Sequence, residues 1–111
     1  MKTKFSILFA LIMFAFIGTL SAKDILTKVT FKVSGNCETC EARIEKAAKI
    51  KGVKSADWNQ ETKEISVVYA PEKVDINSIK QSIADAGYDT DSIKATNASY
   101  KLLPQCCQYT R

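Results

Sequence analysis

Histidine is absent from the 111-residue sequence, and its two methionines, Met1 and Met13, both lie near the start. Histidine is the side chain used most often for acid–base catalysis near neutral pH, so its absence removes the commonest general base. The sequence also contains neither a coherent acid–base pair nor a phosphate-binding loop. We therefore expect that the protein is not an enzyme.

The first 22 residues have the pattern of a secretory signal peptide. A basic start is followed by an unbroken apolar run from Ile7 to Ile17 and by a small-residue exit, Gly18-Thr19-Leu20-Ser21-Ala22. The run is short for a transmembrane helix, and an uncleaved membrane anchor is the alternative. We predict cleavage after Ala22 or one residue earlier, and a periplasmic or secreted protein whose mature form is not embedded in the membrane.

The part that follows the leader has little net charge. Without Lys2 and Lys4 it keeps 14 basic and 12 acidic residues, a net charge of +2, and the lysines are scattered along it. Nucleic-acid-binding proteins gather basic residues into a patch, so we expect no nucleic-acid partner. The length that remains suffices for one small two-layer domain.

Apolar and polar residues alternate in three segments, as in half-buried β-strands. The predicted strands cover residues 25–33, 53–59 and 64–69, and a short fourth strand is expected near residues 90–95.

Two helices separate these strands. The first begins at Cys37 or Glu38 and runs to about Lys51, and the second is capped by Asp75 and ends at Gly87. One sheet with both helices on the same face buries the apolar stripes of the helices. The sequence therefore predicts an α+β fold in the order strand, helix, strand, strand, helix, strand.

Four cysteines remain after the leader: Cys37, Cys40, Cys106 and Cys107. The first two form a Cys-x-x-Cys, which fits a redox disulfide, a metal clamp or an inert structural pair, and export favours disulfides. A helix N-terminus stabilises thiolates, and thiolates bind Cu(I), Hg(II) and Zn(II). Two sulfurs alone suit Cu(I) or Hg(II), because Zn(II) takes four ligands. Against a redox role, no tryptophan precedes the pair and no Gly-Pro separates the thiols.

Several motifs together resemble the heavy-metal-associated domain family, which includes copper chaperones, soluble domains of copper-pumping P-type ATPases and the periplasmic mercury-binding protein. The resemblance covers about residues 25–95 and rests on Val33-Ser34-Gly35-Asn36-Cys37-Glu38-Thr39-Cys40, Ile44-Glu45, Lys51-Gly52-Val53 and Ala86-Gly87-Tyr88. It implies a ferredoxin-like βαββαβ sandwich with a four-stranded antiparallel sheet.

The resemblance also implies a function. Cys37 and Cys40 would bind one soft metal ion, with Cu(I) favoured and Hg(II) second, for sequestration or for transfer by thiol exchange at a solvent-facing loop. The expected partner besides the ion is a metal-transporting membrane protein or another metal carrier. Tyr88 matches an aromatic residue that bacterial members carry beside the metal loop, which corresponds to residues 35–40 here. This tyrosine would shield the site or pack in the core.

The metal loop departs from the family's usual motif, Gly-Met-x-Cys-x-x-Cys. Here Gly35 is followed by Asn36 and then by Cys37, so the loop is one residue shorter and lacks the methionine that lies beneath it in other members. Which residue supports this shorter loop does not follow from the sequence.

The last part of the chain is a tail that the family resemblance does not cover. We divide the chain into a signal peptide (residues 1–22), a heavy-metal-associated domain (23–95) and a cysteine-containing tail (96–111), in which Asn97 is placed to cap a short helix. The tail is long enough to return to the metal loop. Cys106 or Cys107 is thus a candidate third ligand, which would also make Zn(II) binding feasible, or a disulfide partner. The alternative function is a small secreted thiol–disulfide protein.

Overall fold

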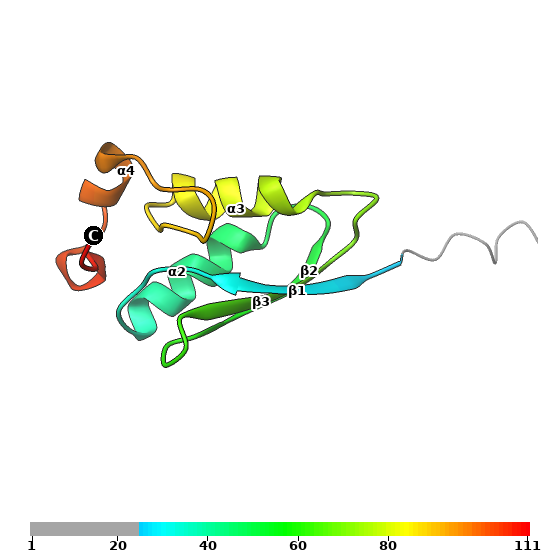
Figure 1. Cartoon of the computed structure of the whole chain (residues 1–111), viewed down its shortest axis with the longest axis horizontal. Helices are drawn as coiled ribbons and strands as arrows, with labels where there is room; N and C mark the ends of the chain where they lie inside the picture. The colour runs from blue at the N-terminus through cyan, green and yellow to red at the C-terminus, as the bar shows by residue number, and fades with distance from the viewer. Residues whose placement is uncertain (1–24) are drawn as a thin grey trace, which may run out of the picture.

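The computed structural model describes residues 25–111, and the predicted signal peptide lies outside the described residues. One layer is an antiparallel sheet of three strands, β1 (Thr27–Lys32), β2 (Val53–Asn59) and β3 (Glu64–Tyr69), in the order β1-β3-β2. Two helices, α2 (Glu38–Ala48) and α3 (Ile76–Asp85), cover one face of the sheet (Figure 1). The predicted α+β fold is confirmed.

Local sequence signals explain where the two helices begin and end. The Asp75 carboxylate accepts a hydrogen bond from the Ser78 backbone N–H at 2.7 Å and so caps α3, as predicted. Cys37 is the residue before α2 and has extended backbone angles, but its side chain makes no capping bond. The helix ends three residues earlier than expected, and Gly52 turns the chain into β2 with a φ of +99°.

The predicted fourth strand does not form. Among the described residues, this segment contributes only an isolated bridge between Thr90 and Val33. The reason is local, because Thr90 bonds to Ile93 through its backbone N–H and its hydroxyl, and the Asp89 carboxylate accepts a bond from the Ala95 N–H. These hydrogen bonds close a tight turn, so the segment does not pair with β1 as a continuous strand.

The core lies between the sheet and the two helices. Its largest members come from β2, β3, α2, α3 and the turn that follows α3, and their side chains are less than 2% exposed: Trp58, Tyr88, Ile44, Ile65, Ile79 and Ile83. Trp58, on β2, is among the most deeply buried of these side chains. Trp58 lies near the C-terminal end of β2, so the core extends to the segment that carries Cys37 and Cys40.

The tail folds back against the domain at the N-terminal end of α2. It contains a short helix α4 (Asn97–Lys101) and a single 3-10 turn η1 (Gln105–Cys107). The α4 cap is Thr96, whose hydroxyl accepts the Ser99 N–H, and not Asn97 as predicted. In Figure 1 the tail and the C-terminus lie at one end of the domain, opposite the end where β1 begins.

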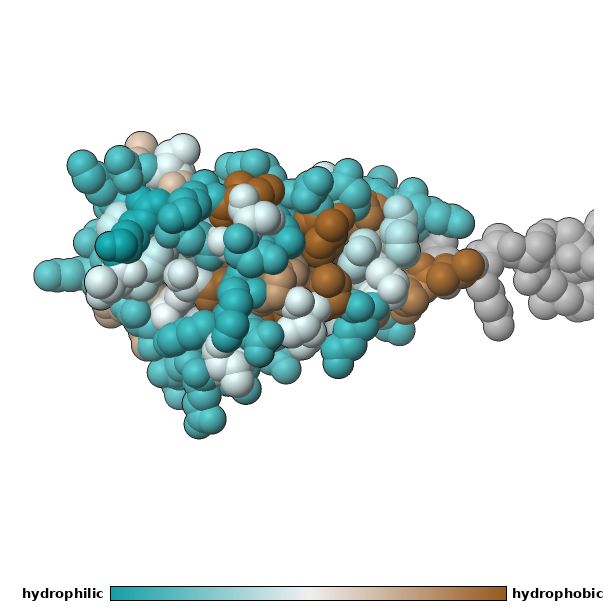
Figure 2. Space-filling view, viewed as in Figure 1, coloured by the Kyte–Doolittle hydropathy of each residue, from teal (hydrophilic) through white to brown (hydrophobic). Residues whose placement is uncertain are grey.

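Apolar surface is confined to a few places on the face drawn in Figure 2. It gathers over the middle of the domain and near the start of β1, while the end that carries the tail is mostly hydrophilic. Ile25, Leu26 and Leu102 are the exposed large apolar residues of the described chain. None of the helices in residues 25–111 has the length and apolar character needed to cross a membrane.

Candidate metal site

The loop that carries the Cys-x-x-Cys rests on the indole ring of Trp58. The Trp58 indole N–H donates to the Val33 carbonyl at 3.0 Å, which anchors the loop where β1 ends. A Cβ atom at Gly35 would lie 2.9 Å from the Trp58 ring and 3.0 Å from the Ile44 side chain, so only glycine fits there. Trp58 and Ile44 therefore fill the space beneath the shorter loop, and sequence reasoning had not assigned them this role.

Cys37 and Cys40 lie at the N-terminal end of α2, one directly before the helix and one in its first turn. Cys40 is fully buried and Cys37 is half-buried. The backbone N–H groups of Cys40 and Thr39, which lie near the Cys37 sulfur at the helix start, lower the pKa of Cys37 below its ordinary value. The helix start thus favours the thiolate form of Cys37, as the sequence predicted.

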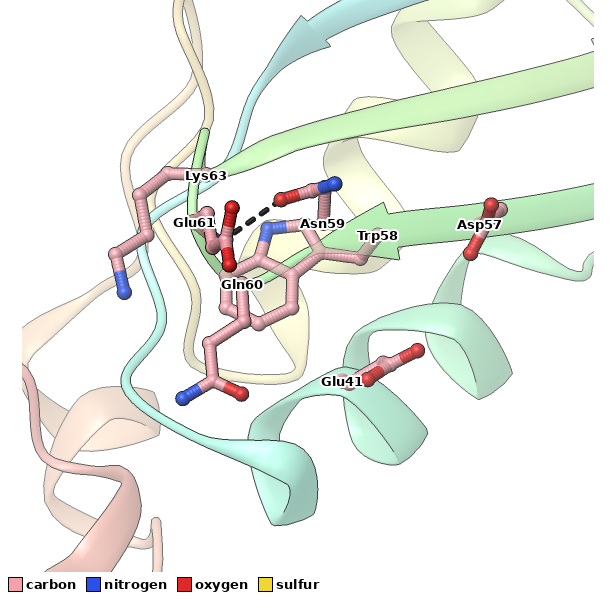
Figure 3. Close-up of a pocket in the computed structure, with 7 residues that line it drawn as sticks. All are labelled: Glu41, Asp57, Trp58, Asn59, Gln60, Glu61 and Lys63. Atoms are coloured by element: carbon pink, nitrogen blue, oxygen red, sulfur yellow. Dashed lines mark hydrogen bonds between the residues drawn. The ribbon is translucent and has the colours of Figure 1, made fainter.

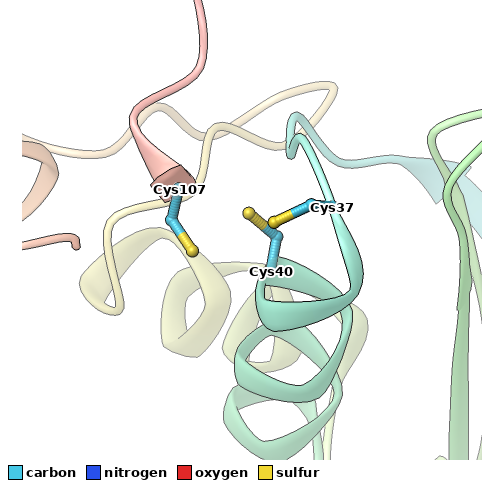
Figure 4. Close-up of side chains that lie close together, drawn as sticks. All are labelled: Cys37, Cys40 and Cys107. Carbon is cyan, nitrogen blue, oxygen red and sulfur yellow. The ribbon is translucent and has the colours of Figure 1, made fainter. Parts of the chain in front are cut away.

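A third sulfur reaches this pair from the tail. Cys107 in η1 is fully buried, and the Sγ atoms of Cys37, Cys40 and Cys107 all lie within 4.8 Å of one another. Figure 4 shows the three side chains converging from two separate segments of the chain. The tail therefore returns to the metal loop, as its length allowed, and of its two cysteines it brings Cys107 into the cluster.

The adjacent thiol, Cys106, is outside the cluster. Its side chain is exposed, and its Sγ atom lies 3.9 Å from that of Cys107. Its backbone carbonyl instead accepts contacts from the metal loop, from the Asn36 amide at 3.4 Å and from the Cys37 thiol at 3.9 Å. Cys106 thus helps to join the tail to the loop through its main chain.

Aromatic and charged residues hold the tail in place. The Tyr109 hydroxyl donates to the Gly87 carbonyl at 2.8 Å and accepts the Asp89 N–H at 2.9 Å. Tyr100 donates to the Tyr109 carbonyl at 2.5 Å, and the Arg111 guanidinium pairs with the Asp89 carboxylate at 3.0 Å. Because Tyr109 is two residues from Cys107, these bonds keep the third sulfur beside the first two.

The surroundings of Cys107 differ from those of Cys37. Burial raises the pKa of the Cys107 thiol to about 12, with a further contribution from the neighbouring Cys40. In the ion-free protein Cys107 is therefore a neutral thiol near pH 7, and it must lose its proton to bind a metal.

Tyr88 lies beside the same sulfurs. Its side chain is fully buried, its ring stacks with that of Tyr109 at a centroid distance of 6.1 Å, and burial raises the pKa of its hydroxyl. The tyrosine thus packs in the core beside the cysteine cluster, and its role in shielding a bound ion stays a prediction.

The metal loop is exposed in part. Asn36, Glu38 and Thr39 face solvent and Cys37 is half-buried, in line with the expected solvent-facing loop, but Gly35 and Cys40 are buried. Gly35 is covered by Trp58 and Ile44 of the domain, while the tail, which the resemblance did not cover, brings Cys107 beside Cys40. Access to the cluster is through the side of Cys37.

A second group of possible ligands lies on the outer surface between α2 and β2. The carboxylates of Glu41, Glu45 and Asp57 are within 4.8 Å of one another, beside a hollow that Trp58 and Lys63 also line (Figure 3). Glu45 has a structural role there, since it accepts the Trp58 backbone N–H at 2.9 Å. Carboxylates prefer hard ions such as Mg²⁺ or Ca²⁺, so this group has a different chemistry from the thiols.

Comparison with known families agrees with this geometry. The profile of the heavy-metal-associated domain matches residues 30–89, a segment that includes the Cys-x-x-Cys, both helices and all but the start of the sheet. The chain belongs to the heavy-metal-associated domain family. The resemblance inferred from the motifs is confirmed, and the tail with its two cysteines lies beyond the matched residues.

Individual relatives support the same assignment. The copper chaperone CopZ of Staphylococcus epidermidis is 38% identical over 66 residues, which are 58% of this chain and 97% of the relative. Two solved structures share the fold of this domain. Oxidized MerP from Ralstonia metallidurans CH34 is 30% identical with a TM-score of 0.57, over 60% of this chain and 96% of that one. The water-soluble region of the P-type ATPase CopA from Bacillus subtilis is 33% identical with a TM-score of 0.57, over 61% of this chain and 46% of that one.

Proposed function

We propose that this member of the heavy-metal-associated domain family binds one soft metal ion through Cys37, Cys40 and Cys107 after export from the cytoplasm, and that it sequesters the ion or passes it to another carrier. The observation that carries the proposal is the convergence of three thiol sulfurs within 4.8 Å. The ion is its cargo, and the protein is not an enzyme. The signal-peptide pattern predicted for residues 1–22 supports the periplasm or the medium as its location.

The donor set fits a soft ion. Thiolates select Cu(I), Hg(II) and Zn(II) over harder ions. A planar three-sulfur site with metal–sulfur bonds of about 2.3 Å needs sulfurs about 4.0 Å apart, so a small contraction of the observed cluster would suffice. Cys37, Cys40 and Cys107 would hold the ion as thiolates, and the bound ion would replace the protons that these groups lose.

Cu(I) is the favoured cargo and Hg(II) is second. The similarity to CopZ supports copper, and the similarity to MerP is compatible with mercury. Zn(II) fits less well, because it takes four ligands and the fourth thiol, Cys106, is outside the cluster. The likeness to the soluble region of a P-type ATPase supports a metal-transporting membrane protein as a partner.

Native mass spectrometry of the reduced protein, titrated with Cu(I), Hg(II) and Zn(II), tests the proposal. We expect one Cu(I) per chain, and loss of that ion to a competing Cu(I) chelator in the double variant Cys37→Ser/Cys40→Ser. Circular dichroism checks that the double variant stays folded. A double variant that keeps full Cu(I) affinity contradicts the proposed site.

The same titration distinguishes metal binding from the alternative function, that of a small secreted thiol–disulfide protein. A thiol–disulfide protein would be isolated with a Cys37–Cys40 disulfide that cycles with a small-molecule oxidant and would show no preference among the three ions.

N-terminal sequencing of the protein from the periplasmic fraction tests export, with the mature chain expected to begin at Lys23 or Ala22.

A further inference from the structure

One buried polar group of the site has no partner. The Tyr88 side chain is fully buried, and its hydroxyl makes no hydrogen bond to any residue of the described chain. A buried hydroxyl without a partner costs free energy, because folding removes it from water and returns no bond. A phenylalanine at this position would avoid the cost, so the hydroxyl is unexplained by the stability of the ion-free protein.

The sulfurs of Cys107 and Cys40 lie beside this hydroxyl, and the Arg43 side chain is a further neighbour. Both of these cysteines are fully buried, and the stacked rings of Tyr88 and Tyr109 keep the tyrosine beside the segment that carries Cys107. The unpaired donor therefore lies at the third sulfur of the site.

The chemical state of that sulfur changes when an ion binds. A neutral thiol is a weak hydrogen-bond acceptor, but a thiolate carries a full charge and accepts a bond from a hydroxyl strongly. A buried thiolate also needs compensation, which the ion supplies on one side and a donor can supply on another. The Tyr88 hydroxyl is the unpaired donor in the described chain that can fill this second role.

We propose that Tyr88 is a positioning residue for the third ligand, and that in the metal-loaded protein its hydroxyl donates a hydrogen bond to the Cys107 sulfur. The inference rests on the proposed function and deepens it. On loading, the Cys107 thiol proton leaves to solvent, a metal–sulfur bond forms, and no atom changes its oxidation state. Tyr88 thereby makes the tail cysteine a better ligand and favours ions that accept three sulfurs.

This role predicts opposite effects of one substitution on the two states of the protein. Tyr88→Phe keeps the ring, the stacking and the packing, and removes only the hydroxyl. The ion-free variant should be as stable as the wild type or melt at a higher temperature, because no bond is lost. The loaded variant should hold its ion less tightly, by about tenfold, since it lacks one hydrogen bond to a charged group.

A double-mutant cycle on the full chain tests the inference. Cu(I) affinity is measured against a chelator such as bathocuproine disulfonate for the wild type, Tyr88→Phe, Cys107→Ala and the double variant. Alanine is preferred at position 107, because a serine hydroxyl could itself accept the bond from Tyr88. We expect Tyr88→Phe to weaken binding in the wild-type background and to have no effect in the Cys107→Ala background.

Three further measurements distinguish this role from a merely structural one. Thermal unfolding of the ion-free variants should show no loss of stability for Tyr88→Phe. Tyr69→Phe serves as a matched control, because Tyr69 is in β3 and outside the cysteine cluster, and it should bind Cu(I) like the wild type. X-ray absorption should count three sulfurs around the ion in the wild type and two in Cys107→Ala.

Three results would overturn the inference. They are an unchanged Cu(I) affinity of Tyr88→Phe, an equal loss of affinity in both backgrounds, and a destabilised ion-free Tyr88→Phe protein. Each of these leaves the proposed function standing as long as Cys37→Ser/Cys40→Ser loses the ion. If the cysteine double variant keeps the ion, the proposed function itself fails.

Discussion

The domain and the tail contribute to the site in different ways. Residues 30–89 match the family profile and provide two thiols at a helix start, on a sheet and helix arrangement shared with the relatives. The tail, residues 96–111, lies beyond that match and provides one buried thiol, an aromatic anchor and a cover over the metal loop. The tail, about 16 residues long, therefore adds a third sulfur to a pair that the shared scaffold provides.

The largest expected effect comes from removing the support that the domain gives to the loop. Trp58→Ala should lower the free energy of unfolding by about 3–5 kcal/mol, because it empties a fully buried site and removes the bond to Val33. Urea unfolding measures the change, and Lys54→Ala, an exposed position on the same strand, is the matched control. A variant that unfolds like the wild type would show that Trp58 does not support the loop.

The second prediction distinguishes the contributions of the two tail cysteines to metal binding. Cys107→Ala should weaken Cu(I) binding by about 10–100-fold, because it removes one of the three proposed ligands, while Cys106→Ala should bind nearly as the wild type does. Chelator competition on the two variants gives the comparison. If the two variants bind Cu(I) with equal affinity, the tail contributes to the site but Cys107 is not preferred over Cys106.

The third effect concerns how firmly the tail is docked. Tyr109→Phe removes a hydroxyl that bonds to both Gly87 and Asp89, and it should destabilise the tail by about 1–3 kcal/mol. Hydrogen exchange should rise in residues 97–111 and stay unchanged in the β-sheet. Faster exchange throughout the chain would instead show that domain and tail unfold as one unit.

The smallest effect lies in the domain, far from the site, and depends on pH. The Ser78 backbone N–H holds the pKa of Asp75 below its ordinary value of 3.8. The stabilisation from this cap is therefore complete above about pH 5 and is lost as pH falls through the lowered pKa. Asp75→Ala should reduce thermal stability at pH 7 and narrow its difference from the wild type at pH 3. A difference that is constant with pH would mean that the carboxylate charge contributes nothing to the cap.

The scaffold was predictable because its signals are local. Alternation gave β2 and β3 with the bounds that the structure has, and Asp75 marked the start of α3. The fourth strand was predicted wrongly, since the hydrogen bonds of Thr90 close a turn that alternation does not reveal. For the site, the Cys-x-x-Cys spacing identified two sulfurs, and the length of the tail allowed a third without selecting Cys107.

The sequence alone determined that the chain has four thiols and no histidine and that two thiols stand at the start of a helix, and it predicts a secretory leader. These properties depend on composition and on residues a few positions apart. The tertiary structure decided that Cys107 joins the cluster, that Cys106 stays outside it, and that the Tyr88 hydroxyl lies beside them without a partner. Contacts between residues about 70 positions apart depend on how the tail packs against the loop end of the domain, and no local pattern encodes that packing.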